Sequence, residues 1–144
     1  MTAMLSIRNP DDAPLDRSSL PELPFCELRF LDTNRDVEQG PTLAEVAKGV
    51  TWLKARVLEQ NSVVVLHCTE GISRSTAFAA IGLYLFGLDQ QMVFRRLADH
   101  VEHLSPAPNA AVLEIADELL GSNLSRAYAN GMSGAYRMWE LCNA

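Results

Sequence analysis

The chain has 144 residues, of which 48% are hydrophobic and 21% are charged. These proportions suit one globular domain, and they exclude a disordered chain, a collagen-like repeat and a small disulfide scaffold. Twelve lysine and arginine residues against 18 aspartate and glutamate residues give a net charge of -6. This sign disfavours broad binding to nucleic acid or to an anionic membrane, so neither is an expected partner.

The N-terminal part is expected to hold one strand between two loops. Residues Ala3–Ile7 form a short apolar stretch, and the Pro-, Asp- and Ser-rich segment Asn9–Pro24 is typical of a loop. In Phe25–Leu31, apolar and polar residues alternate, which predicts a strand that leads into the polar loop Asp32–Pro41.

A helix and a buried strand are predicted next. Thr42 and Glu45 have the spacing of a capping box, and apolar residues continue at helical period to about Glu59. The run Val63–Leu66 is apolar and largely β-branched, which is typical of a strand buried in a parallel sheet. We therefore expect this strand at the centre of the sheet.

Helices are predicted over 73–86, 90–104 and 109–120, with a proline-containing break at 105–108. Together these elements predict an α/β fold, a single domain with a mostly parallel central sheet of about four strands flanked by helices on both faces. We assign residues 1–121 to this domain and expect the tail, 122–144, to pack on it. The absence of a secretion signal, of a membrane-length apolar run and of paired cysteines favours a cytoplasmic location.

The chemistry is concentrated in the loop His67–Ser75, between the apolar strand and the following helix. A short loop there turns its backbone N–H groups inward, and the positive end of the helix points to the same place. In that environment Cys68 would be a thiolate near neutral pH. Arg74 offers two parallel donors to a phosphate, and Gly71 gives the backbone freedom that a tight loop needs.

The spacing His67-Cys68, five residues, Arg74-Ser75 resembles the signature of the cysteine-dependent protein tyrosine and dual-specificity phosphatases, most closely that of their compact bacterial members. The resemblance covers about residues 3–121, is strongest over 63–86, and also includes segments Leu28–Asp32, Ser105–Asn109 and Asp117–Gly121. It implies a protein tyrosine phosphatase-like fold and the hydrolysis of phosphate monoesters, phosphotyrosine and phosphoserine or phosphothreonine among them.

The resemblance also assigns roles. Cys68 would attack phosphorus to form a phosphocysteine, Ser75 would help the thiolate leave, and His67 would order the loop through hydrogen bonds. The phosphate oxygens would be bound by the Arg74 side chain and by the backbone N–H groups of Thr69, Glu70, Gly71, Ile72, Ser73 and Arg74. The implied partner is a phosphorylated protein or a small phosphate monoester, and these residue types require neither a metal nor an organic cofactor.

Two candidates remain for the general acid that protonates the leaving group. Asp32 directly follows the predicted strand, where the family has its acid, whereas Asp36 lies closer to Cys68 in sequence. We prefer Asp32, because a strand end constrains position more firmly than a count across a loop. Cys26, on the predicted strand, is expected in the core, with a protective disulfide to Cys68 as the alternative.

A second hypothesis is a phosphate- or phosphoprotein-binding module of the same fold with weak or no catalysis. A sulfur transferase of the rhodanese type is a third, since it too places a cysteine in an anion-binding loop. The serine that follows Arg74 and the C-terminal helices favour a phosphatase.

Overall fold

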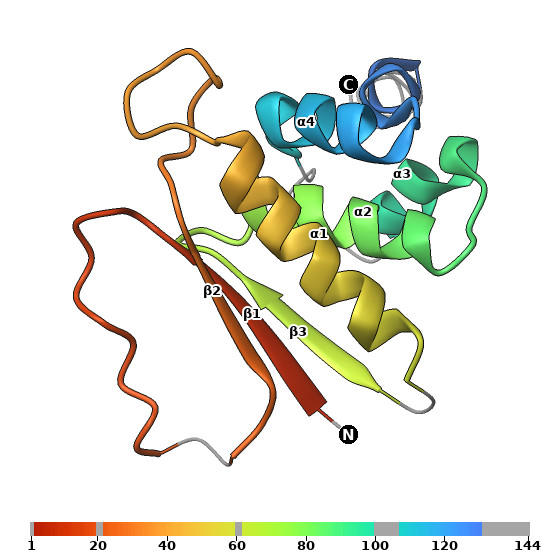
Figure 1. Cartoon of the computed structure of the whole chain (residues 1–144). Helices are drawn as coiled ribbons and strands as arrows, with labels where there is room; N and C mark the ends of the chain where they lie inside the picture. The colour runs from red at the N-terminus through yellow and green to blue at the C-terminus, as the bar shows by residue number, and fades with distance from the viewer. Residues whose placement is uncertain (1, 20–21, 60–61, 100–106, 131–144) are drawn as a thin grey trace, which may run out of the picture.

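A computed structural model of the chain describes residues 2–19, 22–59, 62–99 and 107–130. Its sheet consists of the strands β1 (Thr2–Arg8), β2 (Phe25–Arg29) and β3 (Val63–His67), all parallel, in the order β2-β1-β3 (Figure 1). The register pairs Leu5 of β1 with Cys26 on one side and Leu66 on the other. The carboxyl ends of all three strands therefore meet at one edge of the sheet.

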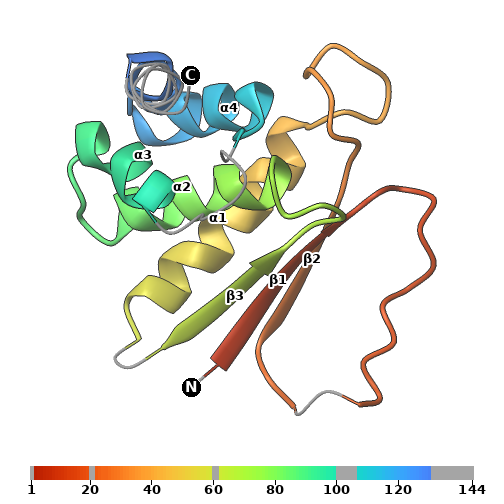
Figure 2. The same cartoon turned by 180° about the vertical axis from the view of Figure 1, so that it is seen from behind.

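Four labelled helices accompany the sheet, and a further helical segment spans 124–130. Their bounds are α1 (Leu43–Val57), α2 (Arg74–Leu85), α3 (Gln90–Asp99) and α4 (Ala110–Leu120). All four lie on the same face of the sheet, as the two opposite views show (Figures 1 and 2). The part of α3 predicted beyond Asp99 lies outside the described residues.

The hydrophobic core lies between the sheet and these helices. One face of the strands supplies Leu5, Ile7 and Leu28, each at most 1% exposed, and α2 packs Phe78 and Ile81 against them. Side chains that alternate along a strand point to opposite faces, so the intervening residues lie on the face away from the helices. The core thus forms where one face of the sheet is buried against the helices, and the first turns of α2 are buried on all sides.

The sheet differs from the sequence-based expectation in three ways. The described residues form three strands where about four were expected, β1 and not Val63–Leu66 is central, and the labelled helices cover one face instead of both. The apolar run is an edge strand of the described sheet, with Val63 59% and Val65 40% exposed. An apolar strand has the same sequence pattern at an edge as at the centre, which explains the error.

The helix start signals are confirmed. The Thr42 hydroxyl accepts a hydrogen bond from the backbone N–H of Glu45 at 3.2 Å, so α1 begins after this cap. The Glu45 carboxylate does not complete the capping box; it accepts instead from the backbone N–H of Arg29 on β2 at 3.0 Å. At α4 the side chain of Asn109 accepts from the N–H of Val112 at 3.0 Å.

The beginning of the expected tail packs on the domain. Leu124 and Ala127 are at most 2% exposed, and the ring of Tyr128 lies 5.3 Å from that of Phe94 in α3. The carboxylate of Asp117 in α4 accepts hydrogen bonds from the N–H groups of Leu124 and Ser125 at the start of this segment. The remainder of the tail, 131–144, lies outside the described residues.

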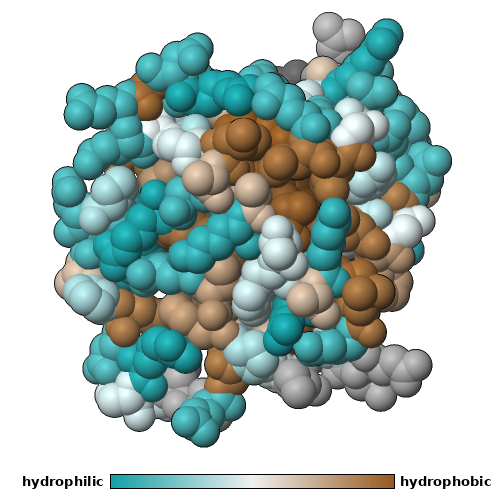
Figure 3. Space-filling view, in the orientation of Figure 1, coloured by the Kyte–Doolittle hydropathy of each residue, from teal (hydrophilic) through white to brown (hydrophobic). Residues whose placement is uncertain are grey.

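Hydrophobic and hydrophilic residues are unevenly distributed over the surface. In the orientation of Figure 1, hydrophobic side chains gather over the helices, whereas hydrophilic side chains cover the loops beside β2 (Figure 3). Among the described residues, no helix is both long enough and apolar enough to cross a membrane.

Candidate active site

A small pocket lies where the three strands end. Its volume is about 250 Å³, and one residue from the end of each strand contributes to it: Asn9 after β1, Asp32 after β2 and Cys68 after β3. In open parallel sheets, ligands bind beyond the carboxyl ends of the strands. The complete lining is Asn9, Asp32, Cys68, Thr69, Glu70, Ser73 and Arg74.

Cys68 is one of the lining residues, and the loop that holds it folds around its sulfur. The loop turns at Gly71, whose φ of 71° lies in the left-handed region that favours glycine. Partial burial raises the pKa of the Cys68 thiol, but hydrogen bonds from the Ser75 side chain and from the N–H groups of Ser75, Gly71 and Glu70 outweigh it, and the net pKa is lowered. Sγ of Cys68 and Oγ of Ser75 are 3.2 Å apart.

Arg74 is the first residue of α2, and its side chain is 5% exposed. Nη1 donates to Oδ1 of Asn9 at 2.7 Å and to the carbonyl of Phe30 at 2.8 Å, while Nη2 donates to the Thr69 hydroxyl at 3.2 Å. Nε is buried and has no hydrogen-bond partner among the described residues. The guanidinium therefore has at least one N–H donor, on Nε, that no described residue satisfies.

Asp32 is held at the pocket by two donors to the same oxygen. Oδ1 accepts from the hydroxyl of Ser73 at 2.6 Å and from Nδ2 of Asn109 at 2.7 Å. Oδ2 takes part in neither bond. Asp36 is exposed in the loop that follows and is not part of the pocket lining, so the geometry favours Asp32 of the two candidate acids.

The segment before α4 supports the cysteine loop from behind. The N–H of Ala107 donates to the carbonyl of Ile72 at 3.0 Å, and the N–H of Asn109 donates to the carbonyl of Ser73 at 3.1 Å. The hydroxyl of Thr76 also donates to the carbonyl of Ile72. These bonds fix the loop backbone just before α2 begins.

The residues predicted to bind phosphate are only partly in the lining. Thr69, Glu70, Ser73 and Arg74 line the pocket, whereas Gly71 and Ile72 do not. The N–H groups of Gly71 and Glu70 nevertheless bond to the sulfur of Cys68, as expected for an inward-facing loop.

His67 lies on the face of β3 away from the helices, within reach of the positive charge of Arg8. Burial, and to a smaller extent the positive charge of Arg8, lowers the pKa of its imidazole. The expected ordering hydrogen bond from its side chain is not formed with any described residue. Its contribution to the loop is therefore its position in the strand.

Cys26 belongs to the core, as expected. It is 6% exposed, and desolvation raises the pKa of its thiol. In the register of the sheet, Cys26 and Leu66 both pair with Leu5 of β1, which lies between them. Because neighbouring strands are ~4.8 Å apart, the backbones of β2 and β3 are separated by roughly 10 Å. Cys68 lies two residues further along, so the alternative disulfide is out of reach without a large backbone movement.

Two residues of this arrangement were not among the predicted site residues. Asn9 directly follows β1 and contacts Arg74, and Asn109 caps α4 while contacting Asp32. For Asn109 the sequence contained a signal, since a helix-capping asparagine follows the Pro-containing break. For Asn9 there was no local signal, because its role depends on the pairing of β1 with β3.

Comparison with known proteins adds no assignment. No protein-family model matches the chain, and neither a characterised protein nor a solved structure is significantly similar to it. In the described ranges, no three side chains of His, Cys, Asp or Glu gather as a metal-binding group. The pocket thus brings together a thiol of lowered pKa, a guanidinium and a carboxyl group.

Proposed function

We propose that the protein is a cysteine-dependent phosphatase that hydrolyses phosphate monoesters through a phosphocysteine intermediate. One observation carries the proposal: Cys68, whose thiol pKa is lowered, shares a pocket of about 250 Å³ with the buried guanidinium of Arg74, whose Nε has no partner among the described residues. A thiolate beside a buried cation with free donors fits a substrate that is itself an anion.

In the first step, the thiolate of Cys68 attacks phosphorus while the bond from phosphorus to the leaving oxygen breaks. Arg74 and the N–H groups of the loop hold the equatorial oxygens, on which the transition-state charge is spread. Asp32, in its protonated form, gives its proton to the leaving phenolate or alkoxide. The products are the phosphocysteine and an alcohol or phenol.

In the second step, a water molecule attacks phosphorus and Asp32 takes one of its protons. The phosphorus–sulfur bond breaks, and inorganic phosphate and the thiolate are released. The hydroxyl of Ser75, 3.2 Å from the sulfur, stabilises the negative charge that returns to it. Asp32 and Cys68 thereby regain their starting protonation states.

The topology supports a protein tyrosine phosphatase-like fold with a small sheet. The cysteine loop connects a parallel strand, β3, to α2, and the carboxyl group comes from the loop after β2. Phosphotyrosine and phosphoserine or phosphothreonine are candidate substrates. The exposed carboxylate of Glu70 at the pocket disfavours substrates with several additional negative charges.

The decisive experiment is hydrolysis of p-nitrophenyl phosphate between pH 5 and 8 in the presence of a chelator. We expect turnover by the wild type, none by Cys68→Ser, and a strong reduction by Asp32→Asn. Asp36→Asn is the matched control and retains activity. Activity that survives Cys68→Ser would refute the mechanism.

The same proteins test the binding-module hypothesis. A wild type that binds vanadate but hydrolyses no more substrate than Cys68→Ser would favour a phosphate-binding module. A wild type that transfers sulfur to cyanide but does not release phosphate would favour the sulfur transferase.

A further inference from the structure

The two edges of the described sheet differ in whether side chains bind their outward-facing backbone groups. At the β2 edge, charged side chains of α1 satisfy outward-facing backbone groups: Oε2 of Glu45 accepts from the N–H of Arg29 at 3.0 Å, and Nζ of Lys48 donates to the carbonyl of Glu27 at 2.9 Å. Charged residues at an edge strand are a common protection against pairing with another strand. This edge is thus closed to a further strand.

Within the part of the chain that the structure describes, no charged side chain protects the β3 edge in this way. Val63–His67 pairs with β1 on one side, and no described residue forms a backbone hydrogen bond to its other side. The strand contains no proline, lysine, arginine, aspartate or glutamate. Val63 is 59% and Val65 40% exposed. An unprotected apolar edge of this kind is a template for an added strand.

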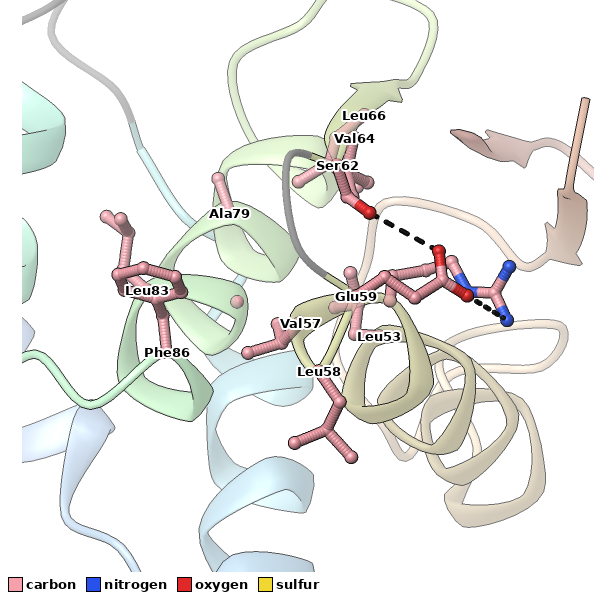
Figure 4. A pocket seen from close by; sticks show the side chains of 12 residues that line it. Leu53, Val57, Leu58, Glu59, Ser62, Val64, Leu66, Ala79, Leu83 and Phe86 are labelled. Carbon is pink, nitrogen blue, oxygen red and sulfur yellow. Dashed lines mark hydrogen bonds and ion pairs between the residues drawn. The ribbon is translucent and has the colours of Figure 1, made fainter. Parts of the chain in front are cut away.

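An apolar groove runs beneath this edge. Its volume is about 760 Å³, and it lies between the end of α1, β3 and α2 (Figure 4). Two large side chains at this groove are mainly exposed, Leu58 by 85% and Phe86 by 75%. Its charged residues, Arg56 and Glu59, form an ion pair at 3.2 Å, so the groove carries no net charge.

We propose that the β3 edge and this groove form a homodimer interface, in which β3 pairs antiparallel with β3 of a second copy. A two-fold axis at Val65 would place Val65 opposite Val65, Val64 opposite Leu66 and Val63 opposite His67. Apolar residues then meet apolar residues in all but the outermost pairs, and the two three-stranded sheets become one continuous sheet.

The charge distribution favours a second copy of this chain as the occupant. Two copies with a net charge of -6 each repel one another overall. The described residues of this edge and its groove carry no net charge, so two copies meet there without local repulsion. With the two-fold axis at Val65, the apolar residues of this edge also face apolar residues of the same edge in the second copy. A stable dimer buries roughly 800 Å² on each partner, more than a five-residue strand offers, so the interface must also include Leu58 and Phe86.

The test is the mass in solution, measured by sedimentation velocity from low micromolar to several hundred micromolar protein. We expect the wild-type mass to rise with concentration towards twice the 15.9 kDa of one chain. Val65→Lys and Val65→Glu each place like charges opposite one another and should weaken association about tenfold or more. An equimolar mixture of these two variants should restore the dimer, because opposite charges then meet at the axis.

Val37→Lys is the matched control, since Val37 is 47% exposed in the loop after β2, away from β3. It should dimerise like the wild type. Val63→Lys, at a more exposed position of the same edge, replaces an apolar side chain opposite His67 and should weaken association with less risk to folding. Circular dichroism checks each variant. The proposal is overturned by a wild type that stays monomeric or by dimers unaffected at Val65. It is also overturned by a monomer in which the 63–67 amides that face away from β1 resist hydrogen exchange, which would mean another occupant.

Discussion

Oδ1 of Asn9 accepts a hydrogen bond of 2.7 Å from Nη1 of Arg74, although 65 positions separate the two residues in sequence. Asn9 and the carbonyl of Phe30 both bind Nη1 of the guanidinium, whereas Nε has no hydrogen-bond partner among the described residues. The carbonyls of Asn9, Pro10 and Asp12 in turn accept hydrogen bonds from Nη1 of Arg29. The loop after β1 thus helps to set the orientation of the Arg74 side chain.

This contact predicts that Asn9→Asp weakens anion binding. A carboxylate at this position adds a negative charge to the pocket lining and competes with phosphate for Arg74, so we expect vanadate and phosphate to bind about tenfold more weakly, ~1.4 kcal/mol. The measurement is inhibition of p-nitrophenyl phosphate hydrolysis by vanadate. Asn34→Asp adds the same charge on an exposed loop outside the pocket and serves as control. Equal inhibition constants for the two variants would contradict the role of Asn9.

The pH dependence of alkylation tests the environment of Cys68. Its thiol pKa is lowered despite partial burial, because Ser75 and loop N–H groups hydrogen-bond to the sulfur. The reactive thiolate therefore persists below the pH at which a free cysteine protonates, and it is lost as pH falls through the lowered pKa. Ser75→Ala removes one of these bonds and should shift the alkylation profile to higher pH.

The measurement is iodoacetamide labelling against pH, followed for each cysteine-containing peptide by mass spectrometry. Cys26 is an internal reference, because desolvation raises its pKa and burial restricts access. It should react slowly and in the same way in both proteins. A Cys68 profile that does not move in Ser75→Ala would show that the backbone N–H groups alone stabilise the thiolate.

The position of Asp32 is tested through Asn109. Asn109→Asp keeps an oxygen that can cap α4 but loses the amide donor to Asp32. The aspartate also repels Asp32, so proton delivery should suffer while helix stability is retained. Substrates with poor leaving groups depend most on that proton, and we expect kcat to fall about tenfold more for phenyl phosphate than for p-nitrophenyl phosphate.

Asp36→Asn is the control for this substrate comparison, since its side chain is not part of the pocket lining. Its two kcat values should change in the same proportion. Thermal unfolding of Asn109→Asp checks that the cap is preserved. If both substrates lose activity equally in Asn109→Asp, Asn109 supports the loop and does not position the acid.

Local patterns in the sequence were enough to predict most helices and the cysteine loop. Thr42 caps α1, and the loop after β3 surrounds Cys68 with N–H groups, because both features depend on residues close in sequence. The order of the strands was not predictable in this way. Whether Val63–His67 lies at the centre or the edge depends on where β1 and β2 pair, and the apolar pattern is compatible with either.

The candidate site shows the same limit. Cys68, Ser75 and Arg74 come from one continuous motif and were identified together. Asn9 reaches Arg74 only because β1 lies beside β3 in a register that pairs Ser6 with His67, which brings the ends of both strands to the same level. A residue whose role arises from strand register leaves no periodic or spacing signal in a single sequence.

The tight packing around Gly49, where α1 meets β2 and α2, predicts a stability effect. A Cβ atom at Gly49 would lie 2.5 Å from Cε1 of Phe78 and 2.8 Å from Cδ1 of Leu28, both of them fully buried. Since neither ring nor methyl group has room to move in a packed core, we expect Gly49→Ala to lower the free energy of unfolding by about 1–3 kcal/mol.

Gly82 is also inside a helix, but a Cβ there would meet nothing within 4 Å. Gly82→Ala should therefore raise the free energy of unfolding by about 0.5–1 kcal/mol, because alanine loses less backbone entropy on folding. Urea unfolding at low protein concentration measures both changes, and equal effects of the two substitutions would show that the contact at Gly49 does not limit how closely α1 packs.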